Sequence, residues 1–243
     1  MTADSAAELK LAIQTNDVAG ALKLLSSDPG LADTVWEAGL SAALLCRYYG
    51  RPEILEAVLQ HRTRKLNVFE AAALGDSKAI EDRLSENPAL LNTHSQDGFT
   101  PLHLAAFFGQ DKIVLWLLSK GADPKIEATN GTALKPLNSA AACADPRAAI
   151  NSCRALLDAG ADVMARQRGG FNALHSAAAN GHRALVELLL ARGADPKSVT
   201  DDGKTPGKLA REKGHSTLAM LLKLPGLPPS SLLMILPLYS ALN

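Results

Sequence analysis

The stretch that decides the fold is DGFTPLHLAAFFGQDKIVLWLLSKGAD, residues 97–123. Its pattern returns 72 residues later, where residues 170–195 carry a Phe, a Leu-His pair, a run of alanines, a Gly turn and a closing Gly-Ala-Asp. A third copy lies 105 residues downstream of the first and includes Thr205, Pro206 and Gly214 in register. Self-similarity at a fixed period predicts a repeat architecture in which each unit is one supersecondary element.

Each copy is predicted to form a helix, a turn and a second helix. Thr100 is placed to cap the first helix, and Pro101 stands where its missing N–H costs nothing. Gly109 is the expected left-handed end of that helix. The spacing of the apolar residues after Gly109 places them on one face of the second helix. These residues are Ile113, Val114, Leu117 and Leu118.

The recurring Thr-Pro-Leu-His, Ala-Ala, Gly and Gly-Ala-Asp resemble the ankyrin repeat, a unit of about 33 residues. The resemblance implies an all-α ankyrin-repeat solenoid of about seven helix-turn-helix units with short β-hairpin fingers. The loosely matched early units look like those of bacterial ankyrin proteins. First helices are expected near residues 7–15, 41–49, 66–74, 101–108, 136–143, 173–180 and 206–213.

Two spacings depart from the ankyrin unit. Only 25 residues separate Gly50 from Gly75, so the hairpin is expected to be missing and residues 60–66 to run directly into the next helix. An insertion around residues 144–151 is expected to form a bulged loop between two helices.

The predicted domain organisation is one ankyrin array followed by a tail. The array spans residues 1–223, with an N-terminal cap at about 5–35, repeats at about 36–200 and a C-terminal cap at about 201–223. Residues 224–243 form a Pro-rich apolar tail.

Composition limits the classes of partner and the compartment. The 25 Lys and Arg balance 25 Asp and Glu, which argues against a nucleic-acid partner because general polyanion binding needs an excess of positive charge. Three cysteines give no disulfide framework and fit a reducing compartment. The first ten residues do not read as a secretory signal. We therefore expect a cytoplasmic protein, and a monomer.

The sequence contains no catalytic or metal-binding signature. Phosphate loops of the GxxxxGK type, HExxH and GxSxG are absent, as are paired CxxC motifs. We expect no enzyme, no cofactor and no metal site. Two readings stay open for Cys143 and Cys153, which flank the insertion: buried reduced thiols, or a redox pair.

The resemblance implies that a protein partner binds on the concave side, against the fingers and the exposed ends of the first helices. Six of the ten aromatic residues fall at these positions, and aromatic side chains are enriched at interface hot spots. The alternative is that Phe107 or Tyr48 packs under the neighbouring finger. The candidate partner-binding residues are Tyr48, Tyr49, Gln96, Asp97, Phe99, Phe107, Phe108, Arg168, Phe171, Asn180, Asp202 and Lys204.

His103 and His175 occupy the motif histidine, which in the ankyrin family bridges neighbouring backbones. They are expected to be structural.

The predicted function is therefore a non-catalytic scaffold or adaptor that binds a protein partner. Two alternatives remain. One is a membrane-associated adaptor held by the tail, which is too short and too interrupted by Pro237 for a membrane span. The other is a regulator of an enzyme, with the cysteine-bearing insertion as its active element.

Overall fold

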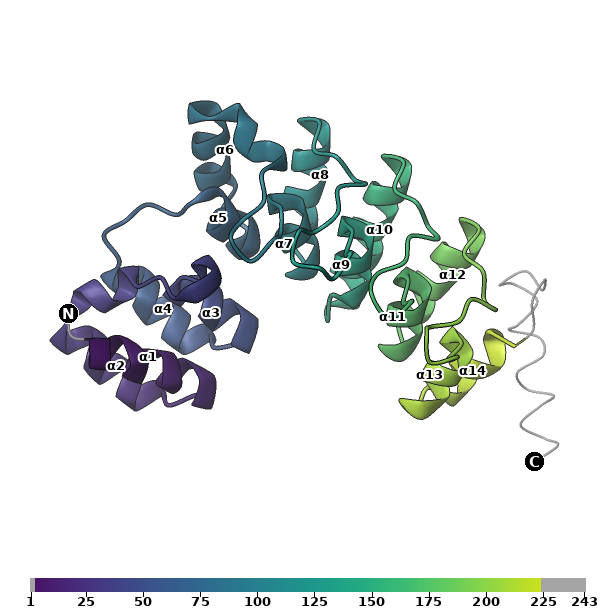
Figure 1. Cartoon of the computed structure of the whole chain (residues 1–243), viewed down its shortest axis with the longest axis horizontal. Helices are drawn as coiled ribbons and strands as arrows, with labels where there is room; N and C mark the ends of the chain where they lie inside the picture. The colour runs from purple at the N-terminus through teal and green to yellow at the C-terminus, as the bar shows by residue number, and fades with distance from the viewer. Residues whose placement is uncertain (1–2, 224–243) are drawn as a thin grey trace. The chain divides into compact units, whose positions relative to one another are not determined.

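The computed structural model describes residues 3–223 and is all-helical over that range, as predicted (Figure 1). The tail at 224–243, with its alternative role in holding the chain at a membrane, lies outside the described residues. Seven antiparallel helix pairs follow one another along the described chain. They are α1 (Ala3–Thr15) with α2 (Val18–Ser27), α3 (Ala42–Tyr49) with α4 (Pro52–His61), α5 (Val68–Leu74) with α6 (Ser77–Glu86), α7 (Pro101–Phe107) with α8 (Asp111–Ser119), α9 (Pro136–Ala142) with α10 (Pro146–Asp158), α11 (Ala173–Ala179) with α12 (Arg183–Ala191), and α13 (Pro206–Glu212) with α14 (Ser216–Leu221).

The predicted signals at the ends of the first helices are confirmed. The Thr100 hydroxyl accepts a hydrogen bond from the His103 N–H, and Asn172 caps α11 in the same way. Gly109 ends α7 with a φ of 74°, in the left-handed region that glycine enters without strain. Asn16, which replaces the turn glycine in the first pair, has a φ of 62°. The motif therefore fixes where each first helix begins and ends.

The chain divides into two compact units, residues 1–105 and residues 106 onward, with the boundary inside α7. In unit 1 (residues 1–105), α1 packs on α3 and α2 packs on α4, and α3 packs in turn on α5. Arginine side chains tie these pairs together: Arg51 donates to the carbonyls of Ile13 and Gln14 at 3.0 Å, and Arg47 donates to Ala73 O at 3.2 Å. The arginines thus satisfy helix carbonyls that have no partner within their own helix.

The link between α4 and α5, residues 62–67, contains no finger, as predicted. Arg62 makes two hydrogen bonds of 3.2 and 3.1 Å to the Glu70 carboxylate, whose side chain is only 2% exposed. Asp33, in the 3-10 helix η1 (Pro29–Asp33), accepts hydrogen bonds from the backbone and hydroxyl of Thr63 and from the backbone of Arg64. We call these five residues the link latch, because they hold the shortened link against the helices on both sides.

Unit 2 (residues 106–223 in the described chain) repeats one packing scheme. The helix α10 packs on both α8 and α12, while α11 packs on α9 and α13. His175 is structural, as expected: its Nδ1 lies 2.7 Å from Asn172 Oδ1, and its Nε2 lies 3.2 Å from the Lys204 carbonyl of the following repeat. One imidazole therefore connects two successive repeats.

The expected bulged loop at residues 144–151 is wrong. Most of the insertion is helical, because α10 begins at Pro146 and runs for 13 residues. Asp145 caps this helix by accepting from the N–H groups of Arg147 and Ala148, and Pro146 occupies the first turn. The extra residues extend the second helix, and only residues 143–145 connect it to α9.

The fingers contain no regular β-strand among the described residues, so the expected β-hairpins are also wrong. Each finger is a turn closed by a backbone bond, such as Gln167 N to Phe171 O at 2.8 Å and Thr200 N to Lys204 O at 3.0 Å. The one isolated bridge in the described chain joins Val35 and Ser41. The fingers are too short for a ladder of paired residues, so turn geometry and not strand pairing defines them.

Candidate functional site

We define the finger face of each unit as its fingers together with the C-terminal ends of its first helices. The structure places every candidate partner-binding residue on one of the two finger faces, which are described separately. In unit 1 these residues are Tyr48, Tyr49, Gln96, Asp97 and Phe99. In unit 2 they are Phe107, Phe108, Arg168, Phe171, Asn180, Asp202 and Lys204.

Tyr48, on the finger face of unit 1, is half-buried and tied to a finger. Its hydroxyl donates a hydrogen bond of 3.2 Å to Asp97 Oδ2, and Ser95 donates to the other oxygen of Asp97. Burial raises the pKa of the Tyr48 hydroxyl, and the Asp97 charge adds to this effect. Tyr48 thus packs under the neighbouring finger, which is the alternative to a partner-binding role.

The other members of the unit 1 face differ in exposure. Tyr49 is 42% exposed and accepts a hydrogen bond of 3.4 Å from Gln14. Phe99 is half-buried, with its ring centroid 5.8 Å from that of His103. Gln96 is exposed and closely approaches Gly39, where an added Cβ would lie 2.9 Å from Gln96 Cβ. Tyr49 and Gln96 therefore offer the most accessible side chains of this group.

The finger tips of unit 2 are joined to one another by their backbones. Arg168 N donates to Thr132 O at 2.8 Å, and Asp201 N donates to Gly169 O at 2.9 Å. The side chains of Arg168 and Asp202 remain exposed at these tips. Backbone bonding of this kind holds the loops in place while the side chains stay available.

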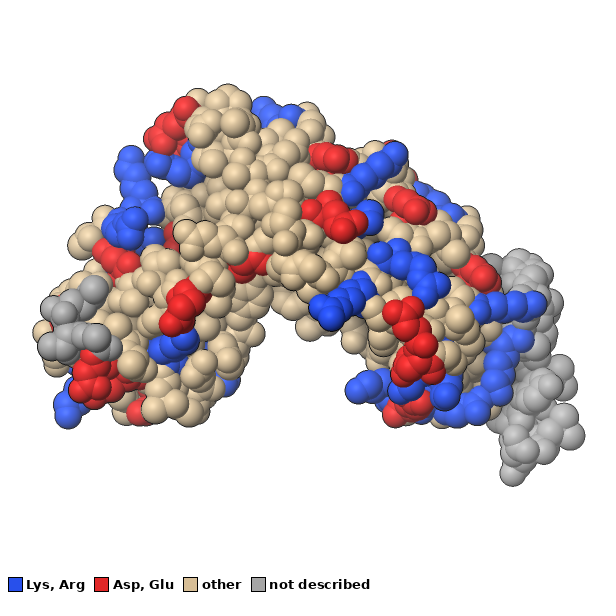
Figure 2. Space-filling view, viewed as in Figure 1, with Lys and Arg blue, Asp and Glu red and all other residues tan. Residues whose placement is uncertain are grey.

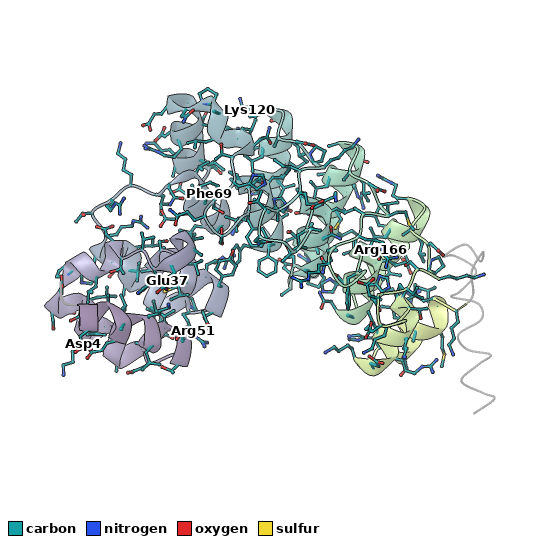
Figure 3. The ribbon with its side chains drawn as sticks, in the orientation of Figure 1. Asp4, Glu37, Arg51, Phe69, Lys120 and Arg166 are labelled. Atoms are coloured by element: carbon teal, nitrogen blue, oxygen red, sulfur yellow. The ribbon has the colours of Figure 1, made fainter. Side chains whose placement is uncertain are left out.

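Charges on the unit 2 face form short alternating pairs. Arg166, which lies on the loop between α10 and α11 (Figure 3), pairs with Asp201 at 3.2 Å. Lys204 pairs with Glu212 at 2.9 Å, and this hydrogen bond and charge raise the pKa of Lys204. The hydrogen bond from Thr200 lowers the pKa of Asp202. On the side of this unit that Figure 2 shows, basic and acidic side chains lie next to one another.

The aromatic residues of unit 2 also differ in exposure. Phe107 is 40% exposed and stacks edge-on against Phe108, with ring centroids 5.0 Å apart. Phe171 is half-buried beside His175, at a centroid distance of 5.7 Å. Asn180 is exposed at the end of α11. Phe107 is thus the aromatic side chain on this face that offers most surface to a partner.

Arg166 is a member of this surface that the sequence reasoning missed. The available signal was its position two residues before Arg168, because side chains two positions apart in an extended segment point the same way. Arg166 lies before the motif positions carried over from the ankyrin repeat, and for that reason it is not among the predicted partner-binding residues.

The three cysteines are buried, and none of them forms a disulfide. Burial raises the pKa of Cys46 to about 12 and raises the pKa of Cys153 as well, with a further contribution from the charge of Cys143. Among the described residues, no three His, Cys, Asp or Glu side chains are grouped so that they could hold a metal ion. None of the described helices has the length and apolar character needed to cross a membrane.

The chain resembles curated proteins along much of its length. It is 35% identical to the nuclear factor NF-kappa-B p105 subunit of Gallus gallus, over 63% of this chain and 15% of that protein. It is 41% identical to ankyrin repeat and SOCS box protein 16 of Mus musculus, over 44% of this chain and 24% of that protein. It is 31% identical to the tyrosine-protein kinase Shark of Drosophila melanogaster, over 70% of this chain and 18% of that protein.

The chain spans less than a quarter of the length of each of these relatives. All three are animal proteins, and they give no support to the expected resemblance to bacterial ankyrin proteins. A family model of three ankyrin repeats matches residues 9–128, and a second ankyrin-repeat model matches residues 156–210. Together the two models match well over half of the chain, which therefore belongs to the ankyrin-repeat family.

Proposed function

We propose that this chain is a non-catalytic scaffold or adaptor that binds a protein partner on the finger face of unit 2. Ankyrin repeats generally mediate protein–protein interaction, which supports a protein as the partner. The family expectation of a concave binding side is part of this proposal.

The observation that carries the proposal is the backbone bonding between successive finger tips. Because Arg168 N and Asp201 N are bonded to neighbouring fingers, the loops need little further ordering when a partner binds. Preorganisation of this kind raises affinity by reducing the entropy lost on association. The exposed side chains of Phe107, Arg168 and Asp202 then supply an apolar contact and both signs of charge.

The chemistry of the face favours a protein over a nucleic acid. Nucleic-acid affinity rests on an excess of Lys and Arg that neutralises phosphates. Here Arg166 and Lys204 are each paired with a carboxylate on the same face. An aromatic residue amid mixed charges is typical of a protein interface.

The cysteines bear on two parts of the proposal, the absence of catalysis and the cellular location. Buried thiols that stay protonated at neutral pH support inert cysteines, and with them a non-catalytic role. The three cysteines without a disulfide also support a cytoplasmic location, where thiols are kept reduced.

The experiment compares two triple variants in a cross-linked pull-down from cell lysate. The test variant carries Phe107→Ser, Arg168→Glu and Asp202→Lys on the finger face. The matched control, whose net charge is likewise unchanged, carries Leu115→Ser and Lys112→Glu at exposed positions on α8 and Glu187→Lys on α12. Circular dichroism must show that both variants remain helical.

We expect a protein captured by the natural chain to fall at least about tenfold with the test variant and to be retained by the control, because truncating interface hot spots costs more than about 1.4 kcal/mol in total. Capture that survives the test variant, or that is lost only with the control, contradicts the proposed site.

A further inference from the structure

A dipeptide on the finger between α8 and α9 carries a chemistry that the proposed binding role does not use. The chain contains two Asn-Gly pairs, Asn130–Gly131 in this finger and Asn180–Gly181 at the end of α11. In such a pair the backbone nitrogen of the glycine can attack the side-chain amide of the asparagine, because glycine has no Cβ that shields this nitrogen. The fold places the two pairs in different surroundings.

The first pair is open to solvent. Asn130 and Gly131 are both exposed, at the tip of the finger that the bond from Ala128 N to Leu134 O closes at 2.8 Å. Gly131 has a φ of 75°, and an added Cβ would meet nothing within 4 Å. Solvent therefore reaches both partners of the reaction.

The side-chain amide of Asn130 is held and polarised by the residue after the glycine. Asn130 Oδ1 accepts hydrogen bonds from Thr132 N at 3.2 Å and from the Thr132 hydroxyl at 2.5 Å. When a nitrogen adds to the amide carbon, negative charge develops on this oxygen, and donors that already point at the oxygen stabilise the charge. The bonds also fold the side chain back across Gly131, so the attack needs little further ordering.

We propose that Asn130 deamidates spontaneously in the folded chain, through a cyclic imide formed with Gly131. Gly131 N gives its proton to a base in the solvent and bonds to the side-chain amide carbon of Asn130. The bond from that carbon to Nδ2 breaks, and the nitrogen takes up a proton and leaves as ammonia. Water then opens the imide at either carbonyl, which yields an aspartate or an isoaspartate at position 130. The overall reaction consumes one water, releases one ammonia and involves no oxidation or reduction.

The fold protects the second Asn-Gly pair. Gly181 N donates a hydrogen bond of 3.2 Å to Ala178 O, and Gly181 is half-buried. An added Cβ on Gly181 would lie 2.5 Å from Cε1 of His215, so the His215 ring covers this side of the turn. Attack by Gly181 N first requires the end of α11 to open, which costs free energy. The same dipeptide thus provides an internal control within the chain.

Deamidation changes the finger in two ways. Either product adds one negative charge to the tip, and the isoaspartate also adds one carbon to the backbone between positions 130 and 131. Thr132 O, which accepts from Arg168 N at 2.8 Å, lies directly after this point. A longer backbone moves Thr132 and loosens the bond that ties this finger to the next one. The chemical step is independent of the proposed function, whereas its effect on partner binding rests on that function.

The test is peptide mapping by mass spectrometry of the full chain, with fragmentation that distinguishes isoaspartate from aspartate. One sample is incubated folded at neutral pH and a second in urea. In the folded chain we expect a gain of one mass unit at position 130, at least about tenfold faster than at position 180, because α11 must open before Gly181 reacts. In urea the two positions should react at similar rates, since glycine follows both asparagines.

A variant tests the role of Thr132. Thr132→Val removes the hydroxyl donor and should slow the reaction at position 130 at least about threefold, the rate equivalent of one modest hydrogen bond at the transition state. Thr93→Val, at an exposed threonine of unit 1, is the control and should leave the rate unchanged.

Two results overturn the proposal. One is a folded chain in which Asn130 stays intact while the sample in urea reacts at both positions. The other is a folded chain that reacts equally fast at positions 130 and 180. A rate in Thr132→Val equal to that of the natural chain overturns the assigned role of Thr132.

Discussion

Glu70 is the residue on which the link latch depends. Its buried carboxylate is the bidentate partner of Arg62, and it also accepts from Asn67 N at 2.9 Å. We predict that Glu70→Gln lowers the free energy of unfolding of unit 1 by about 3 kcal/mol, because it leaves a buried guanidinium without its counter-charge. Urea unfolding followed by circular dichroism measures the loss.

The matched control for the latch is Glu187→Gln, which removes one partner of the surface pair between Arg183 and Glu187 on α12. Exposed pairs of this kind contribute less than about 1 kcal/mol. Equal losses in the two variants would contradict the importance of the buried pair.

The histidines of unit 2 make its stability depend on pH. Burial lowers the pKa of His175 and of His182, and for His182 the charge of His215 acts in the same direction while Asp145 opposes it. Above the unfolded-state histidine pKa of about 6.5, both histidines are neutral in the folded and in the unfolded chain, so they do not lower the stability of unit 2. As the pH falls below that value the unfolded state binds protons more readily, so unit 2 loses stability.

We therefore predict a lower urea midpoint for unit 2 at a pH of about 5.5 than at about 7.5, values chosen on either side of the histidine pKa. The change should be smaller in His182→Gln. His182 is the informative position, since its Nδ1 is buried without a hydrogen-bond partner in the described chain. If the urea midpoint of His182→Gln depended on pH as strongly as that of the natural chain, His182 would not contribute to the pH dependence.

The helix α10 shows which part of an element the sequence predicts. Asp145 followed by Pro146 is a helix-start signal, and it places the start of α10 correctly. The expectation of a loop at residues 144–151 rested on repeat length alone and was wrong. The positions of the first helices were predictable because Thr-Pro-Leu-His and the turn glycines specify both of their ends locally. The fingers were not, because whether a short turn pairs as strands depends on neighbouring repeats.

The start of α10 gives a prediction for that element. Asp145→Ala removes the side-chain acceptor for the N–H groups of Arg147 and Ala148. The expected cost is about 1 kcal/mol of unit 2 stability, the usual value of a helix cap. Thermal unfolding measures it, and a variant as stable as the natural chain would show that α10 does not depend on this cap.

The turn after α7 gives a second prediction at this scale. Gly109 and Gly214 both have positive φ angles, of 74° and 84°. An added Cβ at Gly109 would lie 3.1 Å from Cys143 Sγ and 3.2 Å from Ala148 Cβ, whereas at Gly214 it would meet nothing within 4 Å. Gly214→Ala should cost about 1 kcal/mol, and Gly109→Ala about 1 kcal/mol more. Equal urea midpoints would contradict the close packing at Gly109.

At the scale of the whole molecule, the sequence predicts the architecture more fully than the site. Periodicity alone identified the helix pairs, because every pair uses the same local signals. It could not separate Tyr48, held by Asp97, from the exposed Phe107, since burial at these equivalent helix ends is decided by the finger beside each one.

The central claim is that a protein partner binds the finger face of unit 2, and hydrogen exchange on the complex with a captured partner tests it most directly. We predict slower exchange on binding at residues 128–134, 166–171 and 200–204, with unchanged exchange in α8 and α12, because a docked partner excludes water from the finger tips alone. Protection confined to α8 and α12, or to unit 1, would contradict the claim.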